Sequence, residues 1–114
     1  MVTMNISYEK GIKFDEGKLR FDLIPPDSLI ELAKVYTIGA QKYNDNNWRK
    51  GIKWSRIFAA IMRHLWVWFL SEDIDPESHI NHVIHAAWGC FTLFNYSMNR
   101  LEFDDRIKTN RKWI

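Results

Sequence analysis

The sequence has few of the residues that cross-link or interrupt a chain. Its 114 residues include one cysteine, three prolines and five glycines. A single cysteine cannot form an internal disulfide, and no charged segment followed by an apolar stretch opens the chain. We therefore expect neither export nor oxidative stabilisation, and we predict a cytoplasmic protein with few long loops.

Long hydrophobic runs and an excess of charge of one sign are also missing. The most apolar run, 57–70, is interrupted by Arg63 and His64 and falls short of the roughly 20 residues that span a bilayer. Sixteen basic residues against fourteen acidic ones leave a net charge of +2, too little to bind nucleic acid through bulk electrostatics. We expect neither a membrane nor a nucleic acid as a partner, and a polyanionic ligand would need a local basic cluster.

Aromatic side chains and helical spacing are what the sequence has in abundance. Seven Phe, six Trp and four Tyr predict a core of large side chains. Apolar periodicity predicts three helices, from about 28 to 43, 55 to 71 and 79 to 100. Ser28 with Glu31 forms a capping-box pattern for the first, and Ser55 is a plausible cap for the second.

The flanking segments lack this periodicity. Residues 1–26 alternate charge and apolarity, and Pro25-Pro26 favours extended geometry before it; within this arm, Gly17 can take the positive φ of a turn. Residues 101–114 are predicted to be a solvated tail or a short amphipathic helix. The chain is therefore predicted to be one all-α domain, 1–114, with an extended arm and a polar tail.

The second and third helices are apolar on nearly every face. A monomer of this size cannot readily hide so much hydrophobic surface. We therefore predict a helical bundle completed by homo-oligomerisation, as a dimer or a tetramer. Its interfaces are expected to bury Trp66, Trp68, Trp88 and Phe91.

Histidines cluster at the start of the third helix. His82 and His85 have the i, i+3 spacing of two ligands to one metal, and His64 and the acidic residues of the preceding connection are predicted to lie close by. The candidate metal ligands are His64, Glu72, Asp73, Asp75, His82 and His85. Such a set suits Mn, Fe, Co, Zn or, with more carboxylate, Mg. The alternatives are core histidines bonded to carboxylates, and a solvated acidic loop that complements the helix N-terminus.

Basic and aromatic residues elsewhere could bind a phosphorylated ligand. Arg63 lies in the apolar second helix, so we expect it to be buried and paired, either with Glu31 or an acid of 72–77, or with a ligand phosphate. Lys18, Arg20 and Lys42 could contact phosphate as well, although a basic arm is more often simply solvated. Tyr43 and Trp48 could stack on a base while Asn47 donates hydrogen bonds; Trp48 could equally anchor its loop to the core.

Small residues within the helices mark two further positions. Gly39 costs about 1 kcal/mol relative to Ala in a helix, which requires a packing or ligand-approach reason. Gly89, Thr92, Tyr96 and Asn99 continue the His82–His85 stripe as a small and polar seam, which either lines a cavity or packs closely against another helix. Cys90 is expected to be a core residue.

Several motifs together resemble a known family. They are Lys13-Phe14-Asp15-x-Gly17-Lys18-x-Arg20-x-Asp22-Leu23-Ile24-Pro25-Pro26, Gly39-Ala40-x-Lys42-Tyr43, Asn47-Trp48, Trp54, Arg63-His64, Glu72-Asp73-x-Asp75-x-Glu77-Ser78 and His82-x-x-His85-Ala86. In this order they resemble the small phage and prophage proteins of the dATP/dGTP diphosphohydrolase-like family, which is placed near the all-α MazG-like nucleoside triphosphate pyrophosphohydrolases. The resemblance covers about residues 10 to 100 and implies host cytoplasm as the location of a phage-encoded protein.

The resemblance implies an all-helical, oligomeric, metal-dependent enzyme that cleaves a deoxynucleoside triphosphate to monophosphate and pyrophosphate. MazG-type proteins hold Mg with ExxE and ExxD pairs, and this chain has Arg63-His64 and His82-x-x-His85 in the corresponding places. This difference also admits a His/Asp metal site of the kind found in other helical phosphohydrolases.

Residues and resemblance together predict a nucleoside triphosphate pyrophosphohydrolase acting on dATP or dGTP. Its catalytic residues would be His64, Glu72 and Asp75, and its cofactor a divalent metal, Mg or Mn before Zn, Fe or Co. Its substrate-binding residues would be Lys18, Arg20, Lys42, Tyr43, Asn47, Trp48 and Arg63. The alternative is a non-catalytic nucleotide-binding or protein-interaction module in which the histidines and acids form a structural network.

Overall fold

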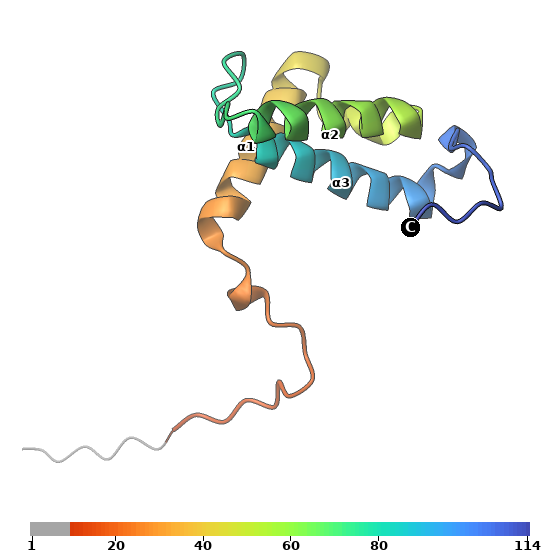
Figure 1. Cartoon of the computed structure of the whole chain (residues 1–114). Helices are drawn as coiled ribbons and strands as arrows, with labels where there is room; N and C mark the ends of the chain where they lie inside the picture. Colours follow the sequence, from red (N-terminus) through yellow and green to blue (C-terminus); the bar gives the residue numbers. More distant parts are fainter. Residues whose placement is uncertain (1–9) are drawn as a thin grey trace, which may run out of the picture.

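Three α-helices make up most of the computed structural model, which describes residues 10–114. They are α1 (Pro26–Tyr43), α2 (Trp54–Phe69) and α3 (His82–Asn99), with short 3-10 turns η1 (Phe21–Leu23), η2 (Asn47–Lys50) and η3 (Leu101–Phe103) (Figure 1). Over residues 10–114 there is no strand, only one isolated bridge between Ile74 and Asn81. The predicted all-α class is confirmed. None of the described helices is long and apolar enough to cross a membrane.

The core lies between α2 and α3, which run antiparallel (Figure 1). Trp54, Ile57 and Ile61 of α2 face a buried stripe on α3. The approach is close because Gly89 has no side chain: a Cβ there would collide with Cγ1 of Ile61. The predicted seam is thus a close helix contact along Gly89, Thr92 and Tyr96, whereas Asn99 is exposed.

The ends of the helices differ from the sequence prediction. α1 begins at Pro26, because proline is preorganised for the first turn, and Ser28 forms no capping box: its amide donates to Asp27 Oδ1. α2 begins at Trp54, and Ser55 bonds to Asp105 instead of capping. α3 begins three residues late, at His82, where the Asn81 side chain accepts a hydrogen bond from the amide of Val83.

The flanking segments behave differently from each other. Residues 10–25 form an arm that leads away from the helices, with η1 in it and a turn at Gly17 (φ 80°), as predicted (Figure 1); residues 1–9 of the predicted arm lie outside the described part. The tail was predicted to be solvated or a short amphipathic helix. Its residues 105–114 are exposed and non-helical, as the first alternative predicts, although two of them contact the start of α2. Asp105 bonds to Ser55, and the Arg106 guanidinium lies 4.7 Å from the centre of the Trp54 ring.

One face of the α2–α3 pair is open in the single chain. Phe58, Trp66, Phe91 and Phe94 are each more than half exposed. Cys90 is also exposed, so the prediction that it is a core residue is wrong: it follows Gly89 by about 100° around α3 and therefore points away from α2. Trp88 instead is half-buried beside Tyr36 of α1.

Candidate functional site

Three side chains from different elements converge at one end of the α2–α3 pair. His64 lies near the end of α2, Asp75 in the connection between the helices and His82 at the start of α3. One ligand atom of each lies within 4.8 Å of the others. Nδ1 of His64 is 2.8 Å from Nδ1 of His82. The antiparallel pairing places these residues together although 18 residues separate the two histidines.

A second layer of side chains holds the outer edges of the imidazoles. Nε2 of His82 lies 3.1 Å from Oε2 of Glu72. Nε2 of His85 lies 2.6 Å from Oγ of Ser78 and 3.6 Å from Oδ2 of Asp75. The His85 ring also stacks on that of His64, with centroids 4.6 Å apart and planes 10° apart. Carboxylates and hydroxyls in this position fix the tautomer and orientation of a ligand histidine.

Backbone hydrogen bonds hold the connection that carries Asp75. The amide of Asp75 donates to the carbonyl of Ile80, and the amide of His82 donates to the carbonyl of Asp73. Oδ1 of Asp75 accepts from the amide of Glu77 at 3.0 Å. The Asp75 carboxylate is therefore fixed by its own loop, and its second oxygen remains on the histidine side.

Burial and neighbouring charge set the protonation of these groups. Partial burial, and then the nearby imidazoles His85 and His82, lower the pKa of His64. Burial likewise lowers the pKa of His85, although Asp75 opposes this. Burial works against ionisation of Asp75, but the hydrogen bond from the Glu77 amide and the facing histidines outweigh it, so its pKa lies below its ordinary value. Neutral imidazoles beside an ionised carboxylate are the protonation states that bind a metal.

The donor set fits a transition metal better than magnesium. Two imidazole nitrogens and one carboxylate oxygen suit Mn, Fe, Co or Zn, whereas Mg prefers oxygen ligands alone. Among the described residues this is the one group of three or more such side chains with that spacing. Of the other predicted ligands, Glu72 and His85 touch the group from outside. Asp73 contributes its backbone carbonyl and has an exposed side chain.

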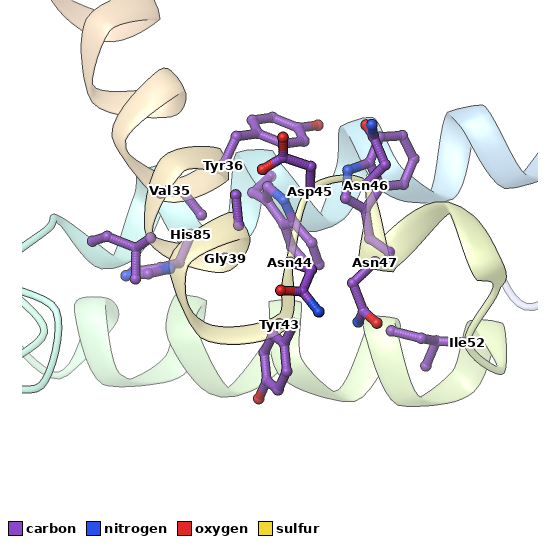
Figure 2. A pocket seen from close by; sticks show the side chains of 14 residues that line it. Val35, Tyr36, Gly39, Tyr43, Asn44, Asp45, Asn46, Asn47, Ile52 and His85 are labelled. Carbon is purple, nitrogen blue, oxygen red and sulfur yellow. The ribbon is translucent and has the colours of Figure 1, made fainter.

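A cavity of about 400 Å³ adjoins this group, because His85, which stacks on His64, is one of the residues that line it. Figure 2 shows it between the end of α1 and the loop that follows. Its aromatic wall consists of Tyr36, Tyr43, Trp48 and Trp88, and its amides come from Asn44, Asn46 and Asn47. Gly39 also lines it, and a Cβ there would have no other heavy atom within 4 Å. Packing within the described part of the chain therefore does not require a glycine at this position of α1.

The predicted base-binding residues Tyr43, Asn47 and Trp48 therefore line one cavity. Trp48 also anchors its loop, because its carbonyl accepts a hydrogen bond from the buried Tyr96 hydroxyl at 2.6 Å. The anchoring of the loop through Trp48 is confirmed, and stacking of its ring on a base remains a prediction. Tyr36 packs edge-on against its ring, with centroids 5.9 Å apart.

The predicted phosphate-binding residues do not converge within one chain. Lys18 and Arg20 lie in the arm, where Arg20 pairs with Asp22 at 2.7 Å. Lys42 lies at the end of α1, with its ammonium 5.1 Å from the centre of the Tyr43 ring. The expectation that Arg63 is buried and paired is wrong: it is exposed, and it makes no ion pair within residues 10–114. It follows the core residue Ile61 by about 200° around α2 and so points outward.

Arg49 is a cation that the sequence reasoning missed. Its guanidinium lies 4.5 Å from the centre of the Trp48 ring, and its Nε donates to Oδ1 of Asn46. It therefore lies against two residues that line the cavity. Its position directly after Trp48 was the available signal.

Comparison with known proteins places this chain in a family. The family model described as "dATP/dGTP diphosphohydrolase, N-terminal" matches residues 8–106. The chain belongs to this family. A dATP/dGTP diphosphohydrolase of Salmonella phage PMBT28 is 43% identical over 96 residues, which cover 84% of this chain and 33% of that protein. This member of the dATP/dGTP diphosphohydrolase N-terminal family thus spans about a third of the length of its phage relative. No solved structure matches it significantly.

Proposed function

We propose that this domain binds a purine deoxynucleoside triphosphate and hydrolyses it to monophosphate and pyrophosphate, with a divalent metal held by His64, Asp75 and His82. The observation that carries the proposal is that His85, which lines the aromatic cavity, stacks on His64 of the metal-type cluster. A nucleotide with its base in the cavity would direct its phosphates past His85. The printed name of the phage relative supports the substrate class.

In this proposal the cavity residues bind the nucleoside. Tyr43 and Trp48 offer ring faces to the base, which stack favourably with purines. The amides of Asn44 and Asn47 can both donate to and accept from the base edge. Lys42 and Arg49 lie beside this cavity and would contact phosphate oxygens. Lys18, Arg20 and Arg63 do not line the cavity, so their contact with a bound phosphate is not provided within one chain.

The metal, when bound, would neutralise phosphate oxygens and lower the pKa of a coordinated water. Mn is our first choice because it accepts both imidazole and carboxylate ligands. His64, Asp75 and His82 would hold it. Glu72 would orient His82 through Nε2, on the side of the ring away from the metal, and would therefore act as a positioning residue.

A nucleotide-binding module without catalysis is the alternative. It is favoured by the hydrogen bonds among His64, His82 and Glu72, since a structural network would have the same contacts.

Two assays on the same protein separate these functions. The first is metal content after purification and after Mn loading. The second is pyrophosphate release from each of the four deoxynucleoside triphosphates with Mg or Mn. The proposal expects metal bound in stoichiometric amount and pyrophosphate released from dATP or dGTP, with both lost in His82→Asn. His79→Asn is the matched control, because His79 is exposed and asparagine tolerates its positive φ. Nucleotide binding without pyrophosphate release at any metal would favour the module.

A further inference from the structure

The arm is built from apolar side chains that alternate with charged ones. Ile12 and Phe14 precede the turn at Gly17, and Leu19, Phe21 and Leu23 follow it. Lys13, Lys18, Arg20 and Asp22 lie between them. The amide of Lys18 donates to the carbonyl of Asp15 and closes the turn. Alternation of this kind is typical of an extended segment that lies on an apolar surface; the arm is non-helical up to Arg20, and Phe21–Leu23 forms the turn η1.

The described part of the chain does not cover these side chains. Between 69% and 89% of each of the five apolar residues is exposed. The arm's hydrogen bonds within residues 10–24 join arm residues to one another: Arg20 to Asp22, Lys18 to Asp15 and Leu23 to Arg20. Figure 1 shows the arm leading away from all three helices. The family match begins at residue 8, so the arm belongs to the domain that defines the family.

The α2–α3 pair has an apolar face that is also open. On α2, Phe58, Met62, Leu65 and Phe69 recur at intervals of four, three and four residues, which places them on one stripe. Two hollows lie along it, one of about 540 Å³ beside Phe58 and Phe94 and one of about 320 Å³ beside Trp66 and Phe69. α1 packs against the other side of α3, where Trp88 meets Tyr36.

We infer that the arm of one copy docks on the open α2–α3 face of a second copy. The chain supplies both an uncovered apolar segment and an uncovered apolar surface, and a two-fold pair of copies would cover both twice. Five large side chains contribute roughly 600 Å² of apolar area. Together with the helical stripe, this reaches the roughly 800 Å² per partner of a stable interface.

Docking in this way would bring cations to the neighbouring copy's site. The hollow beside Trp66 and Phe69 lies at the end of α2 that carries His64. Lys18 alternates with the docked residues, so it would stay at the solvent edge of the docked arm. This last step rests on the proposed function, because it supplies the phosphate contacts that one chain lacks. The association itself does not depend on metal or nucleotide.

Complementation between two variants tests the inference. The arm variant carries Phe14→Ser, Leu19→Ser and Phe21→Ser; the face variant carries Phe58→Ser, Phe69→Ser and Phe94→Ser. All six side chains are exposed in the single chain, and circular dichroism melts check that each variant is folded. The control carries Lys10→Gln and Lys13→Gln in the same arm. Sedimentation velocity at about micromolar protein is the measurement.

We expect the wild type and the control to associate, and each variant alone to dissociate with a dissociation constant raised roughly 100-fold. An equal mixture of the two variants should form a hetero-pair through one intact arm and one intact face, more weakly than the wild type but more tightly than either variant alone. A monomeric wild type, an arm variant that associates normally, or a mixture that associates no more tightly than the separate variants would each overturn the inference. If association behaves as expected but neither metal nor nucleotide binds, the proposed function fails and the docking stands.

Discussion

His82 uses both of its ring nitrogens: Nδ1 lies 2.8 Å from Nδ1 of His64, and Nε2 lies 3.1 Å from a carboxylate oxygen of Glu72. In protein metal sites a histidine usually binds the metal through one ring nitrogen and donates a hydrogen bond to a carboxylate through the other. His82 is also buried, at 5% exposure. The carboxylate therefore decides which nitrogen of His82 is free to bind.

Replacing this carboxylate tests its role. Glu72→Gln should weaken Mn binding about 10- to 100-fold and leave the fold intact, because the outer partner of a ligand histidine tunes affinity by that amount. Isothermal titration with Mn is the measurement. Asp73→Asn is the matched control, since the neighbouring side chain is exposed and outside the group. Equal losses in both variants would mean that the loop's charge, and not the contact with His82, sets the affinity.

The stability of the metal-free protein should depend on pH near 6. Burial lowers the pKa values of His64 and His85 in the folded state. The unfolded chain then binds protons more readily, so the stabilisation is complete above about pH 6.5 and is lost as the pH falls below it. Melting temperatures in chelator at pH 8, 7, 6 and 5 should fall over the last two steps. A melting temperature that is constant from pH 8 to 5 would contradict this.

The carboxylates of Asp104 and Asp105 should affect the stability of the protein at a lower pH than the histidines do. Hydrogen bonds from Arg106 lower the pKa of Asp104, and hydrogen bonds from Ser55 lower the pKa of Asp105. Their stabilisation is present above about pH 4 and is lost only as the pH falls further. Asp105→Asn should therefore leave the loss near pH 6 unchanged. A shift of that loss in the variant would point to the tail instead of the histidines.

Adding a side chain at Gly39 and at Gly89 should have different effects, one on nucleotide binding and the other on stability. Gly39→Leu should fill the cavity and raise the dissociation constant for dATP or dGTP at least tenfold while the fold persists, because a Cβ at Gly39 meets open space. Gly89→Ala should instead destabilise the protein by about 1–3 kcal/mol, since the added methyl meets Ile61. Nucleotide titration and thermal melts of both variants provide the comparison. Normal nucleotide binding by Gly39→Leu would remove the cavity from the site.

Arg63 should be of little consequence to the fold. Its side chain is exposed on α2, and surface substitutions usually change stability by no more than about 0.5 kcal/mol. Arg63→Ala should melt like the wild type, whereas Arg49→Ala should weaken nucleotide binding in a salt-dependent way, because Arg49 lies over Trp48. Loss of folding in Arg63→Ala would instead support the sequence-based interpretation that Arg63 forms a buried ion pair.

The sequence predicts the helices better than it predicts which way their polar residues point. Periodicity identified α1, α2 and α3 because apolar spacing is strong in each. The orientation of Arg63 was readable from Arg56, which lies seven residues earlier on the same face of α2 and is also exposed. Cys90 could not be oriented in this way, because α3 is apolar on nearly every face.

The histidine group was predictable because a short connection brings the end of one helix near the start of the next. The roles within it were not. Glu72 and Asp75 lie in one acidic stretch, and only the turn that bonds Asp75 to Glu77 and Ile80 distinguishes an inner carboxylate from an outer one. Arg49 was not identified from the sequence, because its place beside the cavity depends on the position of Trp48. The hydrogen bond from Tyr96 to the Trp48 carbonyl sets that position.

Equilibrium titration of the chelated protein with Mn, followed by electron paramagnetic resonance, tests the metal centre most directly. The wild type and His79→Asn should each bind Mn in stoichiometric amount, and His64→Ala and His82→Asn should bind it at least tenfold more weakly while remaining folded. Equal Mn binding by all four proteins, or none by the wild type, would contradict a metal centre at His64, Asp75 and His82.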